Sequence, residues 1–199
     1  MWERYGTLTP MVAGIVLAAL ALSTPAAATN LIYLRCESAT GTVTAGDLDA
    51  SSIGEDLAGQ SHPMSVVDDY ALVLSYTEGA QSTPLPGGGA DYDYAGLTIV
   101  RPEASSSPNF LKALFTGEVW TYCVLEFYRR DSSEFKKYRE ITMETVNVVQ
   151  IEPRAVTQFE GAGTGKNHLE AITFSFRKIK WSSDQGPEFY FDLESGEQP

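Results

Sequence analysis

The chain has 199 residues, with 26 acids against 14 bases, which gives a formal net charge of −12. Its hydrophobic fraction of 43% is too high for a disordered chain and sufficient for a core that needs neither a disulfide nor a metal. The acidic charge argues against nucleic acid and anionic membranes as partners, because both are negative themselves. Residues 29–100 contain ten acids and one base, so a strongly negative face or end is expected. Such a face could orient contacts between copies, or only keep the protein soluble.

The N-terminus has the pattern of an export signal. Residues 11–22 (MVAGIVLAALAL) carry no charge and are too short for a membrane span, which needs about 20 residues. Ala26 and Ala28 are small residues suited to a cut after Ala28. We expect a signal peptide over residues 1–28, one domain over residues 29–199, and a periplasmic or extracellular location. An uncleaved anchor and a misassigned start codon are the alternatives.

Three strand patterns precede the middle of the chain, at residues 31–36, 69–77 and 97–100. In the second, Tyr70, Leu72, Leu74 and Tyr76 fall on one face. Residues 107–115 (SPNFLKALF) then change to helical spacing. Ser107 is a candidate N-cap, Pro108 fits the first helical position, and Gly117 would end the helix.

Four further strand patterns follow the helix, at residues 119–129, 139–151, 169–181 and 188–193. In the third of these the apolar side changes at Ile179 and Trp181, which indicates a bulge or an exchange of partner sheet. One short helix among about seven strands predicts an all-β barrel or sandwich with one packed helix.

A long polar segment, residues 79–91 (GAQSTPLPGGGAD), is rich in Gly and Pro and is predicted to be a loop. Its length exceeds that of a simple connection.

The two cysteines, Cys36 and Cys123, are too few for a disulfide-dense scaffold. An exported chain would fold where disulfides form, but pairing depends on a separation that the sequence does not give. Of the two interpretations, we favour a pair of buried thiols.

No motif indicates catalysis, a metal or a cofactor, and we expect none of the three. Residues 161–166 (GAGTGK) lack the spacing of a phosphate-binding loop and precede a strand, so they predict a hairpin turn. The only histidines, His62 and His168, have no neighbours at metal-ligand spacing. A Cys123–His168 dyad is conceivable, although a mid-strand thiol among apolar residues is usually inert. A hydrolase with two carboxylates across a cleft stays open as a weaker alternative.

Several segments together resemble the haemolysin-coregulated protein (Hcp) family, the tube-forming subunits of type VI secretion systems. They are residues 107–117 (SPNFLKALFTG), 122–127 (YCVLEF), 141–149 (ITMETVNVV) and 168–179 (HLEAITFSFRKI). The resemblance covers roughly residues 30 to 194. The predicted signal peptide and the long acidic region at residues 40–63 depart from the family pattern.

The resemblance implies a small β-barrel of about seven or eight strands with one flanking α-helix. It also implies hexameric rings that stack into a tube, and a core domain without catalytic activity. The loop at residues 79–91 would then reach a neighbouring subunit or ring. The residues expected to make this contact are Gly79, Gln81, Pro84, Pro86, Gly87, Gly88, Gly89 and Asp91. The expected partners are further copies of the chain, with secretion-machine components or cargo effectors beside them. From a different class, the alternative is an exported monomeric binding module that kept the barrel and lost the ring; its aromatic patch would include Tyr92 and Tyr94.

Overall fold

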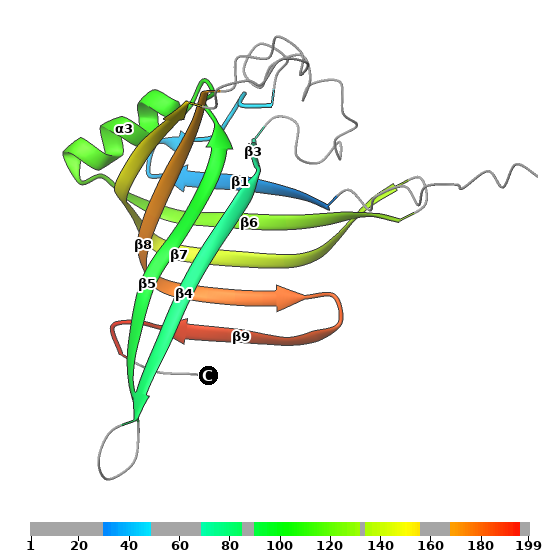
Figure 1. Ribbon diagram of the computed structural model, residues 1–199, viewed down its shortest axis with the longest axis vertical. Coiled ribbons are helices and arrows are strands. Elements are labelled where there is room, and N and C mark those ends of the chain that lie inside the picture. The colour runs from blue at the N-terminus through cyan, green and yellow to red at the C-terminus, as the bar shows by residue number, and fades with distance from the viewer. Residues whose placement is uncertain (1–29, 49–68, 85–89, 132–133, 156–167, 196–199) are drawn as a thin grey trace, which may run out of the picture.

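The computed structural model describes residues 30–48, 69–84, 90–131, 134–155 and 168–195. The predicted signal peptide lies outside these ranges. The described elements, in chain order (Figure 1), are β1 (Asn30–Ser38), β2 (Gly41–Thr42), β3 (Ala71–Val73), β4 (Ser75–Pro84), β5 (Ala90–Pro102), α3 (Ser107–Thr116), β6 (Val119–Asp131), β7 (Glu134–Ala155), β8 (His168–Ser183) and β9 (Gly186–Asp192).

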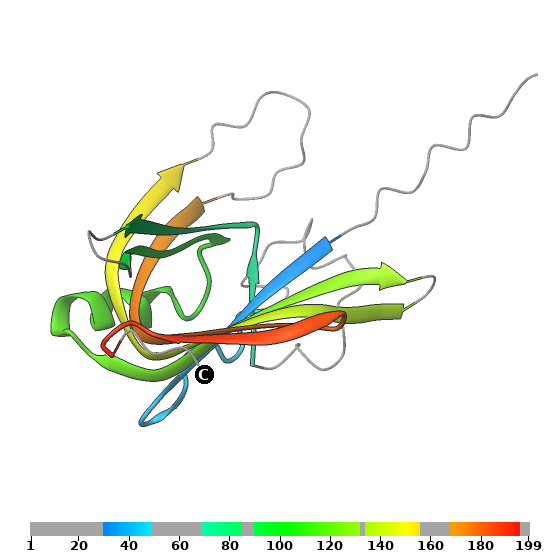
Figure 2. The same ribbon diagram turned by 90° about the horizontal axis from the view of Figure 1, so that it is seen from below.

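All strand pairs are antiparallel and belong to one sheet of order β2-β1-β6-β7-β8-β5-β4, with β3 on β1 and β9 on β8. The sheet is bent into a barrel because β3 pairs with β1 and continues through Leu74 into β4. Figure 2 shows the strands curving around this barrel. The predicted all-β class with one short helix is therefore confirmed.

Strand β8 has two successive partners on the same side. Its first part pairs with β5 as far as Phe174, and its second part pairs with β9 from Lys178 onward. This change agrees with the exchange predicted from the apolar shift at Ile179 and Trp181, although both partners belong to one sheet. The part of β5 before Leu97 therefore does not pair with β8.

The helix packs onto one end of the core. Phe110 and Ala113 are fully buried, and the Phe110 ring lies edge-on to Trp120 at 4.9 Å between centroids. The helix begins at Ser107, so Ser106 and not Ser107 is the N-cap residue, and its side chain caps nothing. That hydroxyl instead donates to Asp47. The predicted end at Gly117 is confirmed, with a left-handed φ of +66° that favours glycine.

The predicted loop at residues 79–91 is longer than the connection in the structure, because both of its ends belong to strands. Strand β4 continues through Gly79 and Gln81 to Pro84, and β5 begins at Ala90 and includes Asp91. Gly79 lies opposite a bulge in β5, and Pro84 lies at the end of its strand. Both are positions where a sheet tolerates residue types that otherwise interrupt it. In the part of the chain that the structure describes, no helix is long and apolar enough to cross a membrane.

Candidate functional site

The hairpin of β4 and β5 leaves the barrel and projects beyond it, toward the bottom of Figure 1. We call residues 78–84 and 90–96 the arm. Within the described residues, the arm strands pair only with each other, whereas from Leu97 onward β5 also pairs with β8. Both outer edges of the arm therefore offer unpaired backbone groups. A two-stranded ribbon is marginally stable alone in water, so the arm requires support or a partner.

The predicted contact residues divide between the arm and the undescribed turn. Gly79, Gln81 and Pro84 lie in β4, and Asp91 lies in β5. The others, at positions 86–89, lie outside the described residues. The structure thus places four of them on one hairpin, and their role as subunit contacts stays a prediction.

Two glycines bend the arm where it leaves the barrel. Between the pairs Glu78–Leu97 and Ala80–Tyr94, Gly79 of β4 lies opposite two residues of β5, Ala95 and Gly96, so the bulge is in β5. In β5, Gly96 has a φ of +85°, and a Cβ there would lie 2.6 Å from the backbone oxygen of Phe174. Any side chain at position 96 would therefore push β5 away from β8, just where β8 exchanges its partner. The direction of the arm is set by this close backbone approach.

Side chains clamp the base of the arm to the sheet. The indole Nε1 of Trp181 donates to the Glu78 carboxylate at 3.2 Å, and the Arg139 guanidinium lies 3.7 Å from the same group. Arg139 also donates to the Tyr76 hydroxyl at 2.7 Å. Strands β7 and β8 thus bind the arm through one carboxylate. We call Tyr76, Glu78, Arg139 and Trp181 the clamp.

A half-buried tyrosine, Tyr94, lies beside the clamp with its hydroxyl buried. The Tyr94 ring packs edge-on against Phe176 at 5.1 Å, and its hydroxyl has no hydrogen-bond partner among the described residues. Burial raises the pKa of this hydroxyl, and the neighbouring Glu78 and Tyr76 raise it further. The group therefore stays protonated at physiological pH.

Removing the clamp carboxylate is expected to loosen the arm. In Glu78→Ala, amide hydrogen exchange in residues 80–84 and 90–95 should become at least about tenfold faster, because hydrogen bonds to a charged group contribute about 1.5–3 kcal/mol. Exchange in β6 should not change. Mass spectrometry of exchanging peptides measures both. Glu152→Ala is the control, because it removes a carboxylate from an exposed ion pair in which Glu152 and Arg154 are each 53% exposed. If amide exchange in the arm is as slow in Glu78→Ala as in Glu152→Ala, the clamp is contradicted.

A buried ionic cluster, which sequence reasoning missed, holds the segment after β2 against the start of α3. The Arg101 guanidinium donates to Asp47 at 2.7 Å and to Glu170 at 2.8 Å, and all three side chains are nearly or fully buried. Its plane lies over the Phe110 ring, 4.2 Å from the centroid. Ser105 and the backbone N–H of Ser106 also donate to Asp47, each at 2.8 Å. Every charge has a partner, so the cluster is structural.

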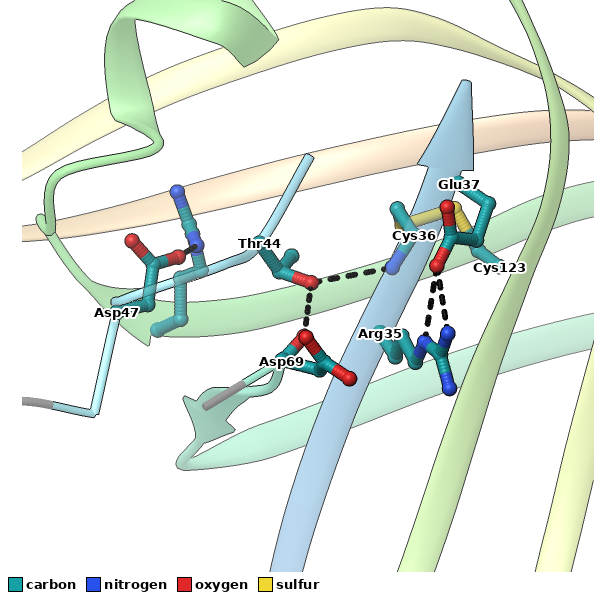
Figure 3. The surroundings of a disulfide bond; sticks show 8 residues. Arg35, Cys36, Glu37, Thr44, Asp47, Asp69 and Cys123 are labelled. Carbon is teal, nitrogen blue, oxygen red and sulfur yellow. Dashed lines mark hydrogen bonds and ion pairs between the residues drawn. A yellow bond between two sulfur atoms is a disulfide. The ribbon is translucent and has the colours of Figure 1, made fainter. Parts of the chain in front are cut away.

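The cysteines form a disulfide, so the interpretation as buried thiols is wrong. Cys36 and Cys123 are opposite each other in the β1–β6 register, with 4.1 Å between their Cα atoms. The Cys36 N–H donates to Thr44 and its carbonyl accepts from Val43, so its backbone bonds point away from β6. Such a non-hydrogen-bonded pair brings the two Cα atoms closest. Figure 3 shows the bridge beside Thr44, whose hydroxyl donates to the Asp69 carbonyl at 2.6 Å.

The described residues contain no group of three or more His, Cys, Asp or Glu side chains placed to hold a metal. Cys123 has no free thiol, so the conceivable Cys123–His168 dyad is wrong. His168 is an exposed residue at the start of β8. His62 and the segment 161–166 lie outside the described residues.

Residues 55–182 match the model of a family described as "Type VI secretion system effector, Hcp". No curated protein matches the chain. Among solved structures, an Hcp protein has a TM-score of 0.71 at 16% identity, over 83% of this chain and 98% of its own. The secreted protein Hcp3 from Pseudomonas aeruginosa has a TM-score of 0.64 at 22% identity, over 82% and 98%. Hcp1 from Salmonella typhimurium has 0.59 at 18%, over 85% and 99%. At these identities the structural likeness shows the fold alone.

Proposed function

The chain belongs to the Hcp family of type VI secretion system effectors, and we propose that it is a non-catalytic structural subunit that assembles with further copies into closed rings. Six copies per ring is the number expected from the family resemblance. The observation that carries the proposal is the arm, a projecting hairpin with two unpaired edges and a clamped base. A clamped base supports an assembly role because it presents the free edges in one direction.

A closed ring needs a head-to-tail contact, in which one surface of a copy meets a different surface of the next. The arm is suited to one side of this contact. Its strand edges can add to a sheet of the neighbour, and it lies away from the core, so that docking would not disturb the barrel. Residues 79–91 are proposed to include this contact, as the resemblance implies. Secretion-machine components or cargo effectors would be further partners of the assembled ring.

We propose further that the chain folds after export, as one domain over residues 29–199. Two independent observations support this. The uncharged run at residues 11–22 and the small residues at positions 26–28 have the pattern of a cleaved signal peptide. The Cys36–Cys123 disulfide is typical of a protein that folds in an oxidising compartment. The proposed location is the periplasm or the cell exterior.

Electron microscopy of negatively stained residues 29–199, purified with the disulfide intact, tests the ring proposal. We expect top views with a closed ring and a central opening. If only particles the size of a single barrel are seen, even when the protein is applied at high concentration, the ring proposal is contradicted.

A binding module is the second candidate, and one observation favours it. A cavity of about 240 Å³ opens between the β1–β2 turn and α3. Its lining is mostly polar and includes Thr40, Thr42, Asn109, Lys112 and Glu118. A monomer in the microscope together with saturable binding of a small polar ligand at this cavity would favour the module over the ring.

A further inference from the structure

Strand β9 has a free edge. It pairs with β8 on one side and with no other strand among the described residues. In Figure 1 it is the lowest strand of this part of the sheet, and Figure 2 views it from below. The Leu193 N–H donates to the Arg177 carbonyl at 2.8 Å. In the alternating pattern of an antiparallel pair, Phe191 then also bonds to β8, and the N–H and C=O groups of Tyr190 and Asp192 point to the free side.

The second half of this edge is open to backbone pairing. Proteins block free strand edges with Pro, Lys or bulges. In β9 these features lie at the start, where Gly186 is followed by Pro187 and the β8–β9 register shifts. Residues 189–192 (FYFD) contain neither Pro nor Lys, and each of them has a regular partner in β8. A further strand can therefore add to the sheet along these four residues.

One face of the edge is apolar. Phe189 and Phe191 lie on the core side of β9, opposite Trp181 and Ile179 of β8. Phe191 and Ile179 belong to the core, and the Phe189 ring lies 5.3 Å from the Trp181 ring between centroids. Phe189 nevertheless remains 44% exposed, because no strand lies beyond it. An apolar side chain of an added strand would cover it.

The opposite face of the edge is acidic. Residues 184–195 contain four acids and no base. Glu188 and Asp192 bind Lys180 and Lys178 of β8, at 2.8 and 3.9 Å. Glu188 is still 63% exposed, so its carboxylate also faces the free side. A basic side chain of an added strand would complement this face, whereas an acidic one would be repelled.

Strand β8 already shows which kind of strand fits β9. It places Ile179 and Trp181 against the apolar face, and Lys178 and Lys180 against the acidic face. We propose that the free edge of β9 binds an extended segment of a partner protein in which apolar and basic residues alternate in the same way. Backbone hydrogen bonds attach the segment, and the two faces select its sequence.

Charge favours a different protein over a second copy as the occupant. Two β9 edges would bring acids against acids. The arm also has free edges, but residues 75–96 contain three acids and no base. A basic segment from another protein complements the edge where these two do not. The inference goes beyond the proposed ring and does not depend on it, because the segment can bind to one copy or to an assembled one.

Fluorescence anisotropy on residues 29–199, with the disulfide intact, tests the edge. The probe is a short labelled peptide in which Lys and Val alternate, and we expect it to bind saturably. Three control peptides have the same composition with all Lys before all Val, the alternating sequence methylated at every backbone nitrogen, and Glu in place of Lys. Each is expected to bind at least about tenfold more weakly, because each loses either the match to the two faces or the backbone hydrogen bonds.

Two substitutions at one position show whether the peptide binds at β9. Tyr190→Pro removes an N–H that points to the free side, and no bond to β8 depends on it. We expect it to weaken binding of the alternating peptide at least about tenfold. Tyr190→Phe keeps the N–H and should bind within about threefold of the unaltered chain. Urea midpoints within about 1 M of the unaltered chain verify folding; if Tyr190→Pro does not fold, the methylated peptide decides on the unaltered chain.

The outcomes separate this inference from the ring. Binding of the alternating peptide that is lost on methylation and in Tyr190→Pro is the required result. No binding, equal binding of any control peptide, or equal binding by Tyr190→Pro and Tyr190→Phe would overturn it. Binding to single chains but not to assembled ones would show that a second copy covers the edge, which overturns the inference and leaves the ring standing. A chain that binds the peptide and never assembles would overturn the ring alone.

Discussion

Replacing Arg101 with Met is expected to lower the free energy of unfolding by about 3–5 kcal/mol. Arg101 is fully buried and is the only base in contact with Asp47 and Glu170 among the described residues. Its removal leaves two carboxylates without their cation in a site that excludes water. A buried charge without a partner costs far more than the ion pair itself contributes. Urea unfolding followed by tryptophan fluorescence measures the change.

Two further variants isolate the cause. Arg129→Met removes an ion pair with Asp184 whose side chains are 40% and 26% exposed, and it should cost only about 0–1 kcal/mol. Adding Asp47→Asn and Glu170→Gln to Arg101→Met removes the stranded charges and should restore a large part of the loss. A loss below about 1 kcal/mol in Arg101→Met alone would contradict the role assigned to the cluster.

Removing the disulfide is expected to lower the free energy of unfolding by about 2–5 kcal/mol. Cys36 and Cys123 are 87 positions apart, so the bridge restricts a long loop in the unfolded chain. The double variant Cys36→Ala/Cys123→Ala, compared with the unaltered chain in urea, measures the loss. Reductant should destabilise the unaltered chain by a similar amount and leave the double variant unchanged. Two free thiols in the denatured, unreduced chain would contradict the bridge.

The helix and most strands could be predicted because their signals are local. In α3, the spacing of apolar residues, Pro108 and Gly117 all lie within one short segment. The long strands β6 and β7 have runs of β-branched and aromatic residues that favour a sheet in any context. Only the N-cap shifted by one residue, because Asp47, distant in the sequence, binds the Ser106 hydroxyl.

The features that the sequence did not predict depend on distant partners. Arg101 is 54 positions from Asp47 and 69 from Glu170, and no pattern in either neighbourhood indicates a buried ion pair. Cys36 and Cys123 pair because the β1–β6 register places them opposite each other, and register is set by the whole sheet. The sequence predicts a loop at residues 79–91 because Gly and Pro usually interrupt strands. In the structure Gly79 lies opposite a bulge and Pro84 lies at a strand end.

The sequence does single out residues 79–91 by their length and composition, although it predicts them as a loop. The sequence does not predict the contacts that hold the base of the arm to the sheet. The clamp joins Glu78 to Arg139 and Trp181, which belong to strands far along the chain, and Gly96 meets the backbone of Phe174. These contacts convert a flexible-looking segment into a hairpin with a defined direction at its base. A hairpin held in one direction at its base can present its free edges to a neighbouring copy, which is what the proposed assembly requires.

The molar mass of residues 29–199 in solution tests the central claim most directly. Light scattering should be recorded with the disulfide intact, across concentration and across salt. The account predicts a mass that rises with concentration to a plateau near six subunits. A mass of one subunit at every concentration and salt would contradict it.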